Sequence, residues 1–322
     1  MKSFMHERLL RSLPSRRSAT VFLKSSSTML ILVMVSVFLS ACGEEKETKP
    51  ALNAVAWGEG SFVAVGANGH ILSSSSGTNW RKIAGKASLP TLTSVVWTGE
   101  LFVAAGAGGN IIWWASPDDW STGTVGAEID LYGLASGPPG VLAVGVGGAV
   151  FLSADGVVWE SIETGILETL RQVAWGDGKY VAVGEEGGIW TSVDGRTWQK
   201  QVSPLSEPTL LLTITAGEGL FFASGSTGVI LQSVGGEEWS QAPTFASQPM
   251  FGIVFGQGIF TFVGANGSVL ITVDGSRFSP AGVPSSEQLN AVTIGNGMFV
   301  AVGGNETIFA SLDGASWVEV HR

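Results

Sequence analysis

The stretch that decides the fold reads LNAVAWGEGSFVAVG, residues 52–66, and it belongs to a unit that occurs seven times. Each unit begins with leucine or methionine, has glycine 14 positions later and has an aromatic residue 28 positions after its start. The starts are Leu52, Leu92, Leu131, Leu170, Leu211, Met250 and Leu289; the glycines are Gly66, Gly106, Gly145, Gly184, Gly225, Gly264 and Gly303; the aromatic residues are Trp80, Trp120, Trp159, Trp198, Trp239, Phe278 and Trp317. Successive units start 39 to 41 residues apart. A period near 40 with strand-like content is typical of a propeller or another repeat array.

Each unit contains four short strand-like runs. In the first unit, residues 52–57 and 61–66 are joined by Gly58-Glu59-Gly60, and Ala67-Asn68-Gly69 leads into a third run. A fourth run starts near Trp80. Glycine and asparagine accept the positive φ of tight turns at low cost, and no helical period is present.

The second run of each unit is continuously apolar, which indicates a strand covered on both faces. Blades packed against two neighbours supply that cover, and seven units can close into a ring without exposed edges. Residues 51–322 are therefore expected to form an all-β, seven-bladed propeller of four-stranded antiparallel blades. Each blade comes from one stretch of chain, so we expect the ring to close by side-chain packing, without strand exchange.

The third turn carries a Ser-x-Asp-Gly-x-x-Trp pattern. Its aspartates are Asp155, Asp194 and Asp313, with Asp274 in a Thr-x-Asp-Gly-x-x-Phe variant. The pattern resembles the Asp-box of bacterial neuraminidase repeats and extends to photosystem II assembly factor-like and sialidase-like propellers. In those families the Asp-box is structural and lies away from the binding face, which implies a structural role for all four aspartates. In the second unit Trp114, Ser116 and Pro117 replace the Ser, Asp and Gly, so that turn must be built differently.

The N-terminus predicts export and a lipid anchor. A basic leader precedes the apolar run 29–39, whose 11 residues are too few for a bilayer-spanning helix of about 20. Leu39-Ser40-Ala41-Cys42 resembles the lipobox of bacterial lipoproteins, and Cys42 is the only cysteine. The expected division is a signal peptide over 1–41, a lipidated tether over 42–50 and the propeller over 51–322. Gly43 follows the cysteine, and in a Gram-negative source this implies the outer membrane, facing the periplasm or the exterior.

The charge balance excludes nucleic acid as a partner. The full chain has a net charge of −10; loss of residues 1–41 removes six of its 17 basic and one of its 27 acidic residues, which leaves −15. Nucleic-acid binding depends on neutralised phosphates. An acidic domain also gains little from anionic lipid, so the membrane contact is expected through acyl chains on Cys42.

Catalytic constellations are absent from the sequence. The mature chain has only His70 and His321, which predicts neither a transition-metal site nor a metal or organic cofactor. The sialidase resemblance implies an arginine triad, an Arg-Ile-Pro motif and a tyrosine nucleophile, but no Arg-Ile-Pro occurs. Tyr180 occupies a core position held by phenylalanine in five other units. We therefore expect no catalytic residue and no enzymatic activity.

Without catalytic candidates, the residues that could carry function are those on the predicted surface. Propellers usually bind on the face made by the second turn of each blade and the connections between blades, where His70, Glu185, Glu186 and Glu306 are candidates. Trp113 is a further candidate, because Trp113 and Trp114 must point to opposite faces of one strand, and we expect Trp114 to be the packed ring. The sequence favours a scaffold that binds an envelope protein. A glycan- or peptidoglycan-binding module is the alternative, and a glycosidase or lyase is a third class.

Overall fold

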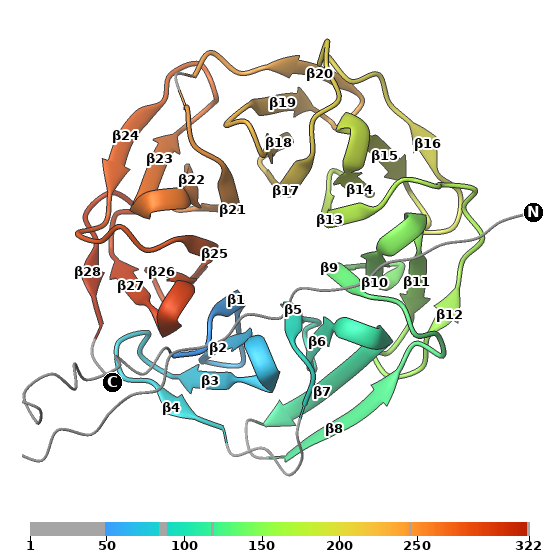
Figure 1. Cartoon of the computed structure of the whole chain (residues 1–322), viewed down its shortest axis with the longest axis horizontal. Helices are drawn as coiled ribbons and strands as arrows, with labels where there is room; N and C mark the ends of the chain where they lie inside the picture. The colour runs from blue at the N-terminus through green and yellow to red at the C-terminus, as the bar shows by residue number, and fades with distance from the viewer. Residues whose placement is uncertain (1–48, 84–88, 117–118, 245, 321–322) are drawn as a thin grey trace, which may run out of the picture. The chain divides into compact units, whose positions relative to one another are not determined.

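The computed structural model describes residues 49–83, 89–116, 119–244 and 246–320, which form seven four-stranded antiparallel sheets. The sheets stand as blades around an open centre, with the strands of each blade in sequence order (Figure 1). The predicted seven-bladed propeller is confirmed. The predicted signal peptide, the lipidation site Cys42 and the tether as far as residue 48 lie outside the described residues. In the described ranges, no helix is both long and apolar enough to cross a membrane.

Four layers of strands run from the axis outward. The innermost are β1 (Leu52–Gly58), β5 (Leu92–Trp97), β9 (Leu131–Gly137), β13 (Leu170–Gly176), β17 (Leu211–Gly217), β21 (Met250–Gly256) and β25 (Leu289–Gly295). The second are β2 (Ser61–Gly66), β6 (Phe102–Gly106), β10 (Gly140–Gly145), β14 (Lys179–Gly184), β18 (Leu220–Gly225), β22 (Ile259–Gly264) and β26 (Met298–Gly303). The third are β3 (Ile71–Ser74), β7 (Asn110–Ser116), β11 (Val150–Ser153), β15 (Ile189–Ser192), β19 (Ile230–Val234), β23 (Ser268–Thr272) and β27 (Ile308–Ser311). The outermost are β4 (Arg81–Lys82), β8 (Asp119–Thr124), β12 (Glu160–Ser161), β16 (Gln199–Lys200), β20 (Glu238–Gln241), β24 (Ser279–Gly282) and β28 (Val318–Glu319).

Two faces of the ring differ in the turns that they carry. The upper face, as named here, holds the turns between second and third strands and the connections between blades. In six blades these turns are 3-10 helices: η1 (Ala67–Gly69), η2 (Ala107–Gly109), η3 (Val146–Gly148), η4 (Glu185–Gly187), η5 (Ala265–Gly267) and η6 (Gly304–Glu306). The lower face holds the turns between first and second strands and the Ser-x-Asp-Gly turns.

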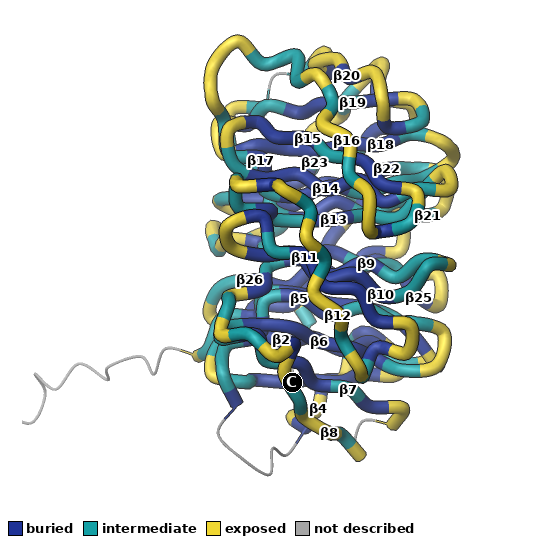
Figure 2. Tube along the Cα trace, turned by 90° about the vertical axis from the view of Figure 1, so that its right-hand side faces the viewer, coloured by how far each residue is buried: buried dark blue, intermediate teal, exposed yellow. Residues whose placement is uncertain are grey.

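The second strand of each blade supplies the core between blades, as the sequence predicts. In β2, Phe62 and Ala64 pack toward blade 7, while Val63 and Val65 pack toward blade 2. All four side chains are fully buried. The buried strands cross the middle of the ring, and exposed turns mark its two faces (Figure 2). Cover on both faces explains why these strands read as apolar runs without alternation.

The recurring glycine marks a close approach of two backbone segments. Gly184 has an extended φ of −173°, which any residue adopts, so conformational freedom is not the reason for glycine there. A Cβ on Gly184 would overlap the carbonyl oxygen of Thr169, in the connection that enters the same blade. The equivalent glycines of five other blades face the same kind of carbonyl: Gly66, Gly106, Gly145, Gly264 and Gly303. Gly225 is the exception, with the Val229 side chain 2.8 Å away.

The aspartates of the Ser-x-Asp-Gly turns bond to their own turns. Asp194 Oδ1 accepts from the backbone N–H groups of Arg196 and Thr197, each at 2.8 Å, and from Ser192 Oγ at 3.0 Å. Trp198 Nε1 donates to the Gly195 carbonyl, which folds the indole over the turn. Asp155 and Asp313 likewise accept from two backbone N–H groups each, and Asp274 accepts from Ser276. These carboxylates therefore accept hydrogen bonds from, and stabilise, their own turns.

We expect Asp194→Ala to lower the free energy of unfolding by about 1–2 kcal/mol at neutral pH, because two turn N–H groups lose their acceptor. The pKa of Asp194 lies below its ordinary value, chiefly because the Thr197 N–H donates to the carboxylate. A depressed folded-state pKa stabilises the protein above the ordinary aspartate value of about 3.9, and this contribution is lost as pH falls through the folded value. Thermal melts at pH 7 and pH 3 test this. The difference in melting temperature between wild type and variant should be smaller at pH 3 than at pH 7. An equal difference at both pH values would refute the stabilising role of the Asp194 carboxylate.

The ring closes through side chains that join blades 7 and 1. Over the described residues β25–β28 form a complete blade without a strand from the N-terminus, as expected. Asn290 Nδ2 donates to the Leu52 carbonyl at 2.8 Å, and Lys49 N donates to Asn305 Oδ1 at 3.0 Å. Val300 and Val302 of blade 7 pack in one cluster with the side chains of β1 and β2.

Candidate functional site

The upper face presents a set of rigid turn tips. In the six 3-10 turns, the middle residue has left-handed φ between 53° and 66°: Asn68, Gly108, Gly147, Glu186, Asn266 and Asn305. Side chains from the connection into the next blade hold some tips, as where Asp130 Oδ1 accepts from Gly108 N at 2.8 Å. Five of the six tip residues are exposed and Gly108 is half-buried, so the tips present accessible points around the channel mouth.

Glu185 and Glu186 are placed differently although they are adjacent. Glu186 is exposed at the tip of η4, with φ of 56°. Glu185 is half-buried, and its Oε2 accepts from the backbone N–H of Thr169 at 3.2 Å. Glu186 thus remains available to a partner, whereas Glu185 helps to fix the connection between blades 3 and 4.

His70 and Glu306 are not on the surface, which corrects the expectation that they contribute to a docking face. His70 Nε2 lies 3.1 Å from Glu306 Oε1, with side-chain exposures of 9% and 10%. The distance is that of an ion pair, although the contact lacks hydrogen-bond alignment. In other blades the position of Glu306 is glycine, because the connection to the next blade passes there; a Cβ on Gly148 would overlap the Ile166 carbonyl. Among the described residues no such connection runs from blade 7 to blade 1, and the Glu306 side chain lies in this place.

The two tryptophans of blade 2 differ in burial, as the alternation of side chains along β7 predicts. Trp114 is 2% exposed and stacks on Phe102, with 5.7 Å between ring centroids. Trp113 is half-buried, and its ring lies over Gly123 of β8. Trp113 keeps an accessible part of its indole, and a binding role for it stays a prediction.

A channel along the axis is a cavity that the sequence did not predict. The seven innermost strands line it, and its volume is about 390 Å³. Every innermost strand carries a β-bulge directly after its first residue, which leaves one residue unpaired in the ladder. These seven residues, here called the bulge ring, are Asn53, Thr93, Tyr132, Arg171, Leu212, Phe251 and Asn290, and all line the channel near the upper face. Bulges re-aim side chains and are frequent next to binding sites.

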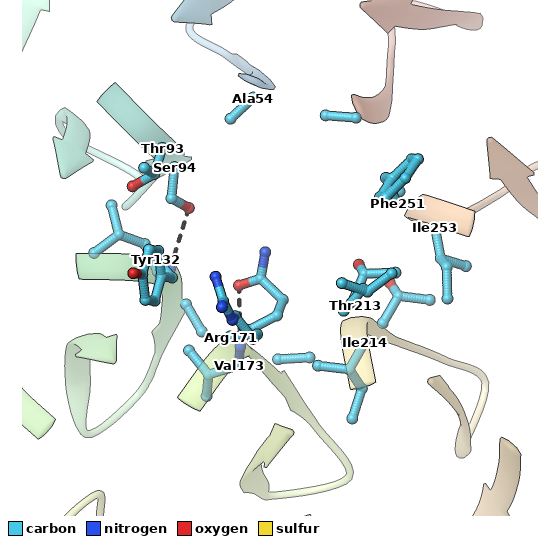
Figure 3. Close-up of a pocket in the computed structure, with 18 of the residues that line it drawn as sticks. Ala54, Thr93, Ser94, Tyr132, Arg171, Val173, Thr213, Ile214, Phe251 and Ile253 are labelled. Atoms are coloured by element: carbon cyan, nitrogen blue, oxygen red, sulfur yellow. Dashed lines mark hydrogen bonds between the residues drawn. The ribbon is translucent and has the colours of Figure 1, made fainter. Parts of the chain in front are cut away.

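The bulge ring has a tied half and an open half. In blades 7, 1 and 2 its side chains donate to the first strand residue of the next blade: Asn290 to Leu52, Asn53 to Leu92 and Thr93 to Leu131, at 2.6–2.8 Å. The open half comprises Tyr132, Arg171, Leu212 and Phe251, which make no such bond among the described residues. Figure 3 shows Arg171 beside Tyr132, with Phe251 across the channel.

Arg171 is the single charged side chain among the residues that line the channel. Its Cζ lies 4.4 Å from the centroid of the Tyr132 ring, a cation–π contact. Its Nε is buried and has no hydrogen-bond partner in the described ranges. Sequence reasoning missed Arg171 because strand alternation does not reveal a bulge. The available signal was that this position holds six different residue types in the seven units.

Aromatic rings join neighbouring blades at the lower ends of the innermost strands. Trp57, Trp97, Trp175 and Phe255 each pack over the glycine that ends the innermost strand of a neighbouring blade. All four rings are half-buried. They hold adjacent blades together, and Trp175 also lines the channel.

The described residues contain no cluster of three or more His, Cys, Asp or Glu side chains that could hold a metal ion. Tyr180 is buried in the core, and its hydroxyl donates to the Gly140 carbonyl of blade 3 at 2.6 Å. Burial raises the pKa of Tyr180 to about 12. Both observations agree with packing, and they disfavour Tyr180 as a nucleophile.

The chain is similar to solved propellers in fold. A structure described as YCF48 bound to D1 peptide matches with a TM-score of 0.67 and 15% identity, over 83% of this chain and 94% of that one. YCF48 from Cyanidioschyzon merolae matches at 0.65 and 14%, over 82% and 96%; the WD40 β-propeller domain of Doa1 matches at 0.67 and 13%, over 82% and 93%. No protein-family model and no curated protein matches the chain. At these identities the likeness establishes the propeller fold alone.

Proposed function

We propose that this protein is a lipid-anchored, non-enzymatic propeller that binds a protein partner at the bacterial cell envelope. The observation that carries the proposal is the upper face, where fixed, exposed turn tips surround an open channel mouth. Residues on rigid scaffolds of this kind commonly carry binding. A propeller of the same fold has been solved with a peptide bound, which supports a protein or peptide as the partner class. The proposal requires neither a cofactor nor a catalytic group.

Two exposed glutamates provide a matched test of the binding face. Glu186 at the upper face and Glu218 in the β17–β18 turn of the lower face are both exposed turn residues with positive φ, 56° and 48°. Reversal of a charge at an interface weakens association through electrostatic mismatch. In affinity capture from membranes, Glu186→Arg should reduce recovery of the partner on the order of tenfold. Glu218→Arg, with the same charge change, should leave recovery unchanged; the opposite pattern would assign binding to the lower face.

The anchor is tested separately at Cys42. Cys42→Ala should abolish labelling by a palmitate analogue and leave an unprocessed or mislocalised chain, because acylation requires the thiol. Equal labelling of wild type and variant would remove the lipoprotein part of the proposal, including the outer-membrane location. The capture experiment would still test, independently of the anchor, whether the propeller binds a partner.

Glycan binding is the second candidate, and the half-buried indole of Trp113 favours it. Purified peptidoglycan sacculi would be sedimented with the protein. Retention of wild type together with loss of Trp113→Ala would favour a glycan module, whereas absence of retention leaves protein binding as the function.

A further inference from the structure

We propose that the open half of the bulge ring is a binding site for a carboxylate group attached to an apolar or aromatic moiety, with Arg171 as its anion-binding residue. The site lies within the channel mouth on the upper face, and its peptide form rests on the proposed function. Its basis is the contrast between Arg171 and the equivalent residues of the tied half.

The N–H groups of the Arg171 guanidinium are not used in bonds between blades, unlike the donors of the tied half. Asn290, Asn53 and Thr93 use theirs to join one blade to the next. The guanidinium of Arg171 forms no hydrogen bond or ion pair with the described residues, and its buried Nε has no acceptor. A buried donor without a partner is costly, and a ligand oxygen at this position would remove that cost.

The positive charge of Arg171 lies in a channel without acidic lining residues. No aspartate or glutamate lines the channel, so Arg171 has no carboxylate there to neutralise it, although the chain as a whole carries a net charge of −10. The Tyr132 ring holds the guanidinium by a cation–π contact without consuming its N–H groups. A planar guanidinium fork matches a carboxylate in a bidentate pair, and one positive charge suits one carboxylate better than a phosphate dianion.

The side chains beside Arg171 indicate which chemical group is attached to the carboxylate of the ligand. The neighbours in the open half are Tyr132, Leu212 and Phe251, and the wall below them includes Val173, Ile214 and Ile253. These side chains provide apolar contact and aromatic faces next to the cation. The chemistry therefore fits a carboxylate next to an apolar group, either the free C-terminus of a peptide with an apolar last residue or a small aryl- or alkylcarboxylic acid.

The test uses three probes with the full chain, measured by isothermal titration. Acetyl-Gly-Gly-Phe with a free carboxylate is compared with the same peptide as its C-terminal amide, and 3-phenylpropionate is the small-acid probe. We expect the free acid to bind at least about tenfold more tightly than the amide, since only the acid forms charge-assisted hydrogen bonds with the guanidinium. Arg171→Gln should reduce the acid to the affinity of the amide and leave the amide unchanged. Equal binding of 3-phenylpropionate and the peptide acid would identify a small acid as the source, and binding of the peptide acid alone would identify a chain end.

The matched control is Arg196→Gln, which removes the same charge from the lower face, where Arg196 pairs with Glu160 at 2.6 Å. It should bind the acid as wild type does. Arg171→Lys keeps the charge without the fork and should fall between wild type and Arg171→Gln, which guards against a variant that fails to fold. Equal affinities for acid and amide, wild-type binding by Arg171→Gln, or no binding of any probe would overturn the site. If the probes fail while partner capture still depends on Glu186, the proposed function stands without this site.

Discussion

Replacement of Gly184 by alanine is expected to lower the free energy of unfolding by about 3 kcal/mol, because the new Cβ would overlap the Thr169 carbonyl oxygen. The overlap involves backbone on both sides, so a rotamer change cannot relieve it. Urea denaturation measured by tryptophan fluorescence gives the change in midpoint and slope.

Gly178→Ala is the control for this prediction. Gly178 lies in the β13–β14 turn of the same blade with φ of 75°, and a Cβ there would meet nothing within 4 Å. Its cost is left-handed strain alone, about 1 kcal/mol. Equal destabilisation by the two variants would show that close approach is not what requires the recurring glycine.

The buried pair at the ring closure gives the second large effect. His70→Ala is expected to lower the free energy of unfolding by about 2 kcal/mol, because Glu306 loses the blade 1 side chain that it contacts. Glu306→Gly should cost less, since it removes a buried carboxylate and relaxes φ of 56° with the residue that the other six blades carry.

A double-mutant cycle separates the pair from its surroundings. His70→Ala combined with Glu306→Gly should be about as stable as Glu306→Gly alone, which corresponds to a coupling of about 2 kcal/mol. Additive effects in the double variant would mean that the two side chains contribute independently, and the pair would then have no role in ring closure.

The fold was predictable because it is repeated. One constant spacing specifies blade number, strand order and the position of the Ser-x-Asp-Gly turns, and seven copies of that signal outweigh the ambiguity of any one strand. The reason for the recurring glycine was not visible, since Gly184 adopts an extended φ and its requirement lies in a carbonyl of a separate segment.

The candidate site was predicted only in part, for two physical reasons. His70 and Glu306 were expected to be exposed because every blade was assumed to resemble the others, but the described residues include no connection from blade 7 to blade 1 that would fill this place. Arg171 was overlooked because the bulge after Leu170 places it in the channel, and a bulge interrupts the alternation from which side-chain direction is inferred. Glu186 lies where a turn tip was expected, because the turn chemistry of the repeat is local.

Site-specific photo-crosslinking in intact cells tests most directly whether this propeller binds a protein through its upper face. A photoreactive amino acid would be placed at Glu186 or at Glu218 in the full-length chain, and crosslinked partners would be identified by mass spectrometry. The account predicts one envelope protein crosslinked from Glu186 and absent from Glu218. Crosslinks to a specific protein from Glu218 alone, or none from either position, would contradict it.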